Sequence, residues 1–152
     1  MTVRALEREQ LLPAAPDEVF DFFSEAHNLE AITPPWLQFR VVTADPIAMR
    51  PGTLIEYRLR LHRLPVNWLT RIESWLPGRR FEDRQLRGPY RLWHHTHTFE
   101  PCDGGTRVRD QVRYAMPLGP LGRLADAAVV RRDLERIFDF RRDAVATAFG
   151  SR

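Results

Sequence analysis

The fold can be worked out from one stretch of the chain, Arg91-Leu92-Trp93-His94-His95-Thr96-His97-Thr98-Phe99, which holds three of its five histidines. Side chains alternate between the two faces of a β-strand. A strand here therefore places Trp93, His95, His97 and Phe99 on one face and His94 on the other. Two large aromatic side chains beside two imidazoles indicate a face that is buried and also contains polar groups.

A tight turn at Asp103-Gly104 fixes how this strand pairs with the next one. Asp-Gly favours a type I′ turn, in which both central residues have positive φ. Such a turn places Cys102 opposite Gly105. Counting outward along antiparallel strands then predicts these facing pairs on the covered face: Phe99 with Val108, His97 with Asp110, His95 with Val112, and Trp93 with Tyr114. The opposite face carries arginines and threonines, as expected of a sheet with one wet face.

The rest of the chain predicts a strand and two short helices, then a meander of strands. We expect the first strand over residues 2–12, a helix that begins at Pro16, and a short helix over residues 29–32 capped by Asn28. Alternating apolar and charged residues predict further strands at 38–43, 53–61, 66–74 and 80–85. The turn between the second and third of these is expected at residues 62–65.

The C-terminal part predicts one long amphipathic helix over residues 121–149. Its apolar residues recur at helical spacing, and they are Leu124, Ala128, Leu134, Ile137, Phe138, Val145 and Phe149. Much of its solvent side is expected to be lined by Arg123, Arg131, Arg132, Arg136 and Arg142. No other segment is long enough to cover the inward face of the sheet, so we expect an α+β fold built as a single domain over residues 1–152.

Composition is typical of a soluble globular protein, with 43% hydrophobic and 28% charged residues. The 23 basic residues are all arginine and are interleaved with 20 acidic ones, without the clustered patch that nucleic-acid binding needs. The lone cysteine, Cys102, favours a reducing compartment. The charged first ten residues do not look like a signal peptide, and no apolar run approaches the roughly 20 residues that span a bilayer. We expect a cytoplasmic monomer or homodimer that neither binds nucleic acid nor inserts stably into membranes.

Several motifs resemble those of the SRPBCC superfamily, which includes START domains, Bet v 1-type allergens and polyketide cyclase/dehydrase-like proteins, and most closely its bacterial ligand-binding members. They are Leu12-Pro13-Ala14-Ala15-Pro16-Asp17-Glu18-Val19-Phe20, the segment 28–37, Phe81-Glu82-Asp83, the segment 88–97 and the segment 104–110. The resemblance implies the helix-grip fold, in which a seven-stranded curved antiparallel sheet, two short helices and a long C-terminal helix enclose a cavity. One departure is the loop at 44–52, which has a single glycine where Bet v 1 proteins carry a glycine-rich loop.

Alternation assigns the inward face of this sheet to the wall of the implied cavity. We expect the wall to contain Tyr57, Leu59, Trp68, Thr70, Ile72, Asp83, Gln85, Trp93, His95, His97, Asp110, Val112 and Tyr114, with Leu134, Ile137 and Phe138 from the helix. A mostly apolar wall with a few polar groups is typical of a small-molecule site.

His97 and Asp110 are the candidate catalytic pair, because the carboxylate can orient the imidazole and raise its pKa. Two alternatives are open for the same pair. The two side chains could simply satisfy each other's hydrogen bonds in the cavity wall, or they could hydrogen-bond a ligand. His95 and His97 form an H-x-H pattern that could bind a metal with Asp83 or Asp110. The adjacent aromatic residues favour an organic site, so we expect no metal and no cofactor.

Three functions follow from these patterns. The first is binding or transport of a small hydrophobic ligand of lipid, polyketide or isoprenoid type. The second is a cyclase, dehydratase or hydrolase activity that uses the His97–Asp110 pair. The third is an interaction module whose arginine-rich outer sheet face binds an acidic partner or RNA.

Overall fold

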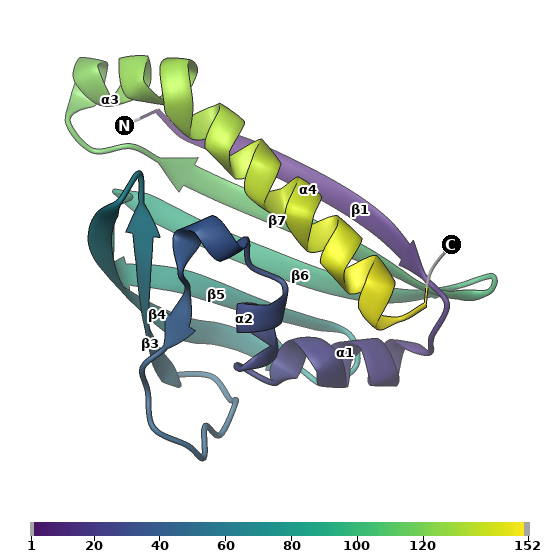
Figure 1. Ribbon diagram of the computed structural model, residues 1–152. Helices are drawn as coiled ribbons and strands as arrows, with labels where there is room; N and C mark the ends of the chain where they lie inside the picture. Colours follow the sequence, from purple (N-terminus) through teal and green to yellow (C-terminus); the bar gives the residue numbers. More distant parts are fainter. Residues whose placement is uncertain (1, 151–152) are drawn as a thin grey trace.

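A curved, fully antiparallel sheet of seven strands forms the body of the protein, in the order β1-β7-β6-β5-β4-β3-β2. The computed structural model describes residues 2–150. Its elements are β1 (Arg4–Leu12), α1 (Pro16–Ser24), α2 (Asn28–Ala31), η1 (Pro35–Leu37), β2 (Arg40–Val41), β3 (Leu54–Leu61), β4 (Leu64–Leu76), β5 (Arg80–Arg87), β6 (Leu92–Cys102), β7 (Gly105–Ala115), α3 (Gly119–Ala125), the π-helical turn η2 (Asp126–Val130) and α4 (Arg131–Ala148). Helix α4 crosses the sheet diagonally, and α1 lies near the C-terminal end of α4 (Figure 1). The predicted helix-grip architecture is confirmed.

The β6–β7 hairpin has the predicted register. The four facing pairs are Trp93–Tyr114, His95–Val112, His97–Asp110 and Phe99–Val108. The predicted turn type is wrong, because Gly104 has positive φ (83°) and Asp103 does not. Gly105 follows the turn at a point of close backbone approach, since a Cβ there would lie 1.9 Å from the carbonyl oxygen of Leu12.

A type I′ turn, with positive φ at both central residues, occurs instead in the β3–β4 hairpin. His62 and Arg63 have φ of 48° and 71°, as a type I′ turn requires. This turn is tighter than predicted, so β4 already begins at Leu64. The expected strand at 38–43 is reduced to Arg40–Val41, because Gln38 adopts a left-handed conformation (φ 46°) at the end of η1.

The two short helices follow the prediction with one correction. Helix α1 begins at Pro16, whose fixed φ suits the first helical position. Asn28 does not cap α2, because it is already the first residue of that helix and His27 precedes it. Its side-chain amide instead donates to the carbonyl oxygen of Phe22 at 2.8 Å, which ties the start of α2 to α1.

The predicted single long helix is interrupted by η2. Asp126 in that turn is buried, accepts a hydrogen bond from the Tyr114 hydroxyl at 2.8 Å and pairs with Arg4 at 3.2 Å. This anchoring changes the helical phase, so Leu124 and Ala128 face solvent rather than the sheet. Leu134, Phe138 and Val145 of α4 are buried as predicted. Within residues 2–150, no helix has the length and apolar character needed to cross a membrane.

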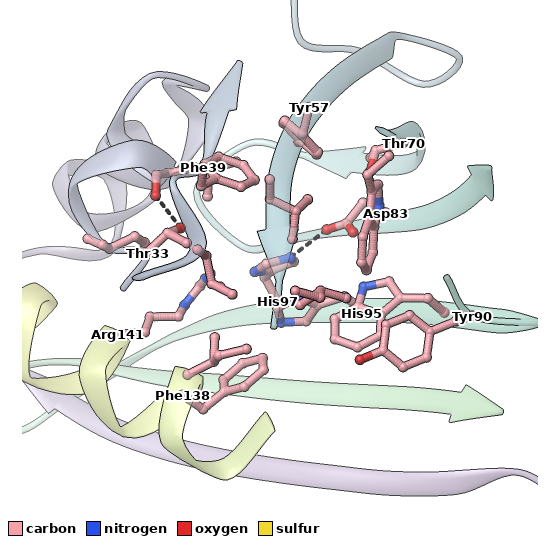
Figure 2. A pocket seen from close by; sticks show the side chains of 18 residues that line it. Thr33, Phe39, Tyr57, Thr70, Asp83, Tyr90, His95, His97, Phe138 and Arg141 are labelled. Carbon is pink, nitrogen blue, oxygen red and sulfur yellow. Dashed lines mark hydrogen bonds and ion pairs between the residues drawn. The ribbon is translucent and has the colours of Figure 1, made fainter. Parts of the chain in front are cut away.

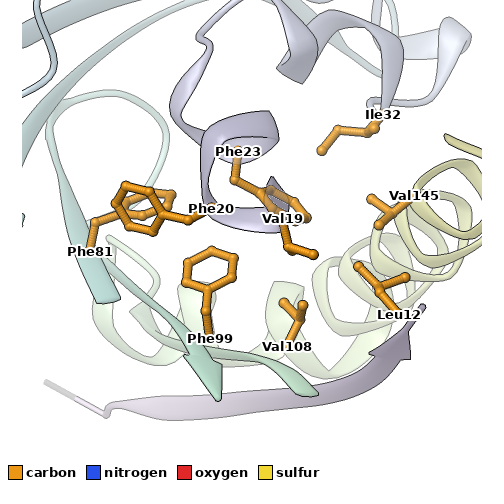
Figure 3. Close-up of a cluster of buried hydrophobic side chains, with 9 residues drawn as sticks. All are labelled: Leu12, Val19, Phe20, Phe23, Ile32, Phe81, Phe99, Val108 and Val145. Atoms are coloured by element: carbon orange, nitrogen blue, oxygen red, sulfur yellow. The ribbon is translucent and has the colours of Figure 1, made fainter. Parts of the chain in front are cut away.

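A solid aromatic core fills the end of the fold beside α1 (Figure 3). Phe20 of α1 contacts three aromatic rings edge-on, those of Trp75 (5.0 Å between centroids), Phe81 (5.9 Å) and Phe99 (5.3 Å). Edge-to-face pairs stabilise beyond their buried area. This core fills the end of the sheet beside α1 with apolar side chains.

Truncating Phe20 tests this core. We expect Phe20→Ala to lower the free energy of unfolding by about 3–5 kcal/mol, because a buried ring is removed and a cavity remains. Leu11→Ala, at a side chain that is 58% exposed, is the control and should change it by about 0.5 kcal/mol or less. Urea unfolding followed by circular dichroism measures both. Equal effects of the two substitutions would contradict the assigned core.

Candidate functional site

Three adjacent strands bring two histidines and two aspartates together on the inward face of the sheet. His95 and His97 of β6 are 5% and 3% exposed. Asp83 of β5 faces His95, and Asp110 of β7 faces His97. Alternation along β6 puts both imidazoles on the same side, so the two carboxylates flank them from either neighbouring strand.

Each carboxylate hydrogen-bonds the imidazole diagonal to it rather than the one it faces. Asp83 Oδ2 lies 2.7 Å from His97 Nε2, and Asp110 Oδ1 lies 2.8 Å from His95 Nε2. Asp110 Oδ1 is also 3.4 Å from His97 Nδ1. Diagonal neighbours across a sheet are within reach of side chains of this length. The predicted His97–Asp110 pair is therefore the longer contact, and Asp83 is the closest partner of His97.

Both faces of the His97 ring are covered. The Phe81 ring stacks on it at 4.0 Å between centroids with an interplanar angle of 15°, and the His95 ring stacks at 3.6 Å with an angle of 26°. Figure 2 shows His97 beside His95 with its hydrogen bond to Asp83. The imidazole is thus held on its two faces by rings and at its two nitrogens by carboxylates.

The two histidines have opposite protonation properties. Burial, together with the nearby charge of His97, lowers the pKa of His95 to about 4 despite its bond to Asp110. Burial also opposes the charged form of His97, but its close polar contacts with Asp110 and Asp83 outweigh burial and raise the pKa of His97. His95 is therefore uncharged at neutral pH, whereas the carboxylates at both nitrogens of His97 favour its imidazolium form.

Both carboxylates stay ionised although burial disfavours their charge. The hydrogen bond and charge of His97 lower the pKa of Asp83. The charge of Arg141 and the hydrogen bond of His95 hold the pKa of Asp110 well below its usual range. Asp83, His95, His97, Asp110 and Arg141 are referred to below as the polar cluster. Its two anions are Asp83 and Asp110, and cationic side chains lie beside both.

Arg141 of α4 belongs to this cluster, and the sequence did not reveal it. Its Nη2 lies 3.6 Å from Asp110 Oδ1, beyond hydrogen-bonding distance, and finds no acceptor among the described residues although the atom is buried. The guanidinium lies 5.2 Å from the centroid of the Phe23 ring and 5.8 Å from that of Phe138. In the sequence Arg141 looks like the other arginines of α4, and only its place in the helical phase sets it apart.

A cavity of about 160 Å³ lies between the inward face of the sheet and α4, at the edge of this cluster (Figure 2). The predicted residues that line it are Tyr57, Leu59, Trp68, Thr70, Asp83, Trp93, His95, His97, Ile137 and Phe138. The lining residues that were not predicted are Leu29, Ile32, Thr33, Leu37, Phe39, Leu61, Tyr90 and Arg141. Alternation could have added Leu61, which shares the face of Leu59. The segment 29–39 could not be placed from sequence, because loops fix its position.

The remaining predicted wall residues lie elsewhere. Val112, Tyr114 and Leu134 pack into a solid apolar cluster with Leu6, and Ile72 packs against Ile55. Asp110 lies behind the histidines, in a separate hollow of about 50 Å³ between β1, β7 and α4.

Gln85, the last predicted wall residue, fixes the β5–β6 turn. Its amide donates to the carbonyl oxygen of Tyr90 at 2.7 Å, and its carbonyl accepts from the Tyr90 backbone at 3.1 Å. Gln85 therefore contributes to the cavity by holding Tyr90, which lines it.

The site is poorly arranged for a metal ion. Ligand atoms of Asp83, His95 and His97 lie within 4.8 Å of one another. Imidazole lone pairs lie in the ring plane, however, and two rings stacked 3.6 Å apart at 26° direct them side by side rather than to one point. The nitrogens that hydrogen-bond Asp83 and Asp110 would also have to lose those contacts.

Nitrogen-detected NMR of labelled protein tests the assigned protonation states. We expect His95 to titrate near pH 4 and to be the neutral Nε2–H tautomer at pH 7, because it donates to Asp110. His97 should titrate above 6.5 as an imidazolium. Two histidines that titrate together near 6.5 would contradict the arrangement.

The dependence of stability on pH provides a second test. His95 has a pKa of about 4 in the folded protein and an ordinary value of 6.5 in the unfolded chain, so the stability that its neutral form contributes above pH 6.5 is lost as the pH falls toward 4. The loss is on the order of 3 kcal/mol. His97 acts in the opposite sense, since its contribution is complete below 6.5 and is lost as the pH rises through its raised pKa.

His95→Gln keeps a side-chain donor for Asp110 and should flatten the decline between pH 6.5 and 4 in urea unfolding. His94→Gln, at the outward-facing imidazole 3.3 Å from Glu82, is the control and should keep the wild-type slope. An unchanged slope in His95→Gln would show that another group causes the decline.

Comparisons with known proteins place the chain in a family. Among solved structures, the chain is similar to Ara h 8.0201 (TM-score 0.71, 17% identity, 97% of this chain and 98% of that one). It is similar to protein CV1439 from Chromobacterium violaceum (TM-score 0.73, 15% identity, 95% and 96%). It is also similar to the Zhui aromatase/cyclase from Streptomyces sp. R1128 (TM-score 0.68, 14% identity, 97% and 96%). These likenesses show the fold.

A search of curated protein sequences finds no match. The sequence model of one family, described as polyketide cyclase / dehydrase and lipid transport, matches residues 12–140. That range includes the whole of β2 to β7, both short helices, and His95, His97, Asp83 and Asp110. The chain therefore belongs to the polyketide cyclase / dehydrase and lipid transport family, within the SRPBCC superfamily.

Proposed function

We propose that the protein binds a small hydrophobic ligand in the cavity between the sheet and α4. The observation that carries this proposal is a mostly apolar cavity with one compact polar cluster in its wall. Trp68, Trp93, Tyr57 and Phe138 supply large aromatic surface there. An apolar lining with a few fixed polar groups is the usual makeup of a site that binds and orients a small molecule.

The volume of the cavity limits what it can hold without rearrangement. About 160 Å³ is close to that of an engineered cavity of roughly 150 Å³ that binds benzene, and it is below the roughly 300–1,000 Å³ of most ligand pockets. A ligand with one ring fits. A long lipid or a multi-ring polyketide would need the segment 29–39 or α4 to move outward.

The histidines suit binding better than acid–base catalysis. A general base works best with a pKa near the operating pH, whereas His95 has a pKa of about 4 and is a weak base. The faces and nitrogens of His97 are all engaged by protein groups, and its two carboxylate contacts favour the protonated form, which is not a base. A cyclase or dehydratase activity, known from the description of the family, is the second candidate. It requires the stacked imidazoles to separate when substrate enters.

Several arginines of the outer sheet face are paired with acidic neighbours. Arg84 pairs with Glu73 at 3.3 Å and Arg80 with Glu82 at 3.0 Å. Arg107 lies 3.1 Å from Glu9. A protein binds nucleic acid through unpaired basic side chains that neutralise phosphates and thereby release the counterions of the nucleic acid. Pairing with acidic residues weakens this effect, so we disfavour a role in RNA binding.

Filling the cavity tests the proposed binding site. Ethylbenzene is the probe, and its dissociation constant is measured by ligand-observed NMR or calorimetry. We expect Ile137→Phe, which adds a ring into the lined space, to raise that constant at least about tenfold, equivalent to about 1.4 kcal/mol. Leu86→Phe, at a 44% exposed position of β5, is the control and should leave it unchanged.

Native mass spectrometry of the protein purified from its own source would identify a ligand that is retained. Equal affinity of both phenylalanine variants for ethylbenzene would place binding outside this cavity. Absence of binding to the wild-type protein would overturn the proposal.

A further inference from the structure

The polar groups of the cavity wall differ in whether the protein already satisfies them. Thr33 donates to the carbonyl oxygen of Leu29 at 2.5 Å, and the Trp68 indole donates to Thr70 at 3.0 Å. His95 and His97 are bound to aspartates. Arg141 lines the cavity, and its buried Nη2 has no hydrogen-bond partner among the described residues, since it lies 3.6 Å from Asp110 Oδ1. The wall therefore holds a cationic donor that lacks an acceptor.

The charges of the cluster balance without a ligand when His97 is the imidazolium that its two carboxylate contacts favour. Asp83 and Asp110 then supply two negative charges, and His97 and Arg141 supply two positive ones, while His95 is neutral. All of these side chains are largely buried, with Arg141 the cation nearest the surface at 14% exposure. A buried charge without a partner costs several kcal/mol. A carboxylate ligand would add such a charge, whereas a carbonyl oxygen would not.

We propose that the cavity selects an uncharged one-ring ligand that carries a carbonyl oxygen, and that Arg141 donates a hydrogen bond to this oxygen. The inference rests on the proposed binding function and specifies its ligand class. The aromatic side chains hold the ring, and the carbonyl gives Arg141 the acceptor that it lacks. A hydrocarbon ligand would offer Arg141 no acceptor. An anionic ligand would add a charge to a cluster whose charges already balance.

Three probes of nearly equal size separate these possibilities: ethylbenzene, acetophenone and benzoate, each titrated into the wild-type protein at pH 7. We expect acetophenone to bind about tenfold more tightly than ethylbenzene, since a hydrogen bond to a charged donor strengthens binding by that order. Benzoate should bind more weakly than acetophenone. The carbonyl carbon of ¹³C-labelled acetophenone should also shift downfield on binding, as it does when a ketone accepts a strong hydrogen bond.

Substitution of Arg141 assigns the preference to this residue. Arg141→Met should bring the affinities of acetophenone and ethylbenzene to within about twofold of each other and abolish the carbonyl shift. Arg142→Met, at the neighbouring arginine that is 53% exposed, is the matched control and should keep the wild-type preference. Ethylbenzene binding by Arg141→Met also shows that the variant is folded, and if that variant does not fold, the wild-type carbonyl shift decides alone.

The outcomes separate this inference from the proposed function. Ethylbenzene binding without a preference for acetophenone, or tighter binding of benzoate, would overturn the inference and leave the binding function in place. If none of the three probes binds, the proposed function fails and the inference fails with it.

Discussion

The interior of this protein depends on an imidazolium held between two carboxylates from the strands on either side. His97 on β6 hydrogen-bonds Asp83 of β5 and contacts Asp110 of β7. Buried charges are tolerated only when they are paired, so each member of this group requires the others to stay in place. The group joins three strands through their side chains as well as their backbones, and it fixes where the wall of the cavity becomes polar.

This polar group divides the interior into two regions with different packing. On one side, the rings of Phe20, Phe81 and Phe99 fill the space against α1. On the other, the side chains of β3 and β4 leave the cavity open beneath α4. Phe81 belongs to both regions, since it packs against Phe20 and stacks on His97. The rigid core therefore supports the imidazole from behind while the cavity lies in front.

Much of the fold and part of the site could be predicted from the sequence, because alternation in strands is a local property. The facing pairs of β6 and β7 required only a turn and a count of residues. Alternation also placed His95, His97 and Asp83 inside. It could not show that each aspartate binds the diagonal imidazole, because that choice depends on side-chain rotamers. The phase change at Asp126 was beyond prediction, since it depends on how the helix packs across the sheet. Arg141 was missed although its spacing of three residues from Phe138 and four from Val145 places it on the buried face of α4.

The balanced charges of the cluster also constrain how the sequence can change over time. Replacing Asp83, Asp110, His97 or Arg141 alone by a neutral residue leaves one buried charge uncompensated, which costs several kcal/mol. Replacing an anion and a cation together restores neutrality. Divergence at these positions is therefore expected to proceed by paired, compensating replacements, so the four alignment columns should covary although the residues belong to four different elements of the fold.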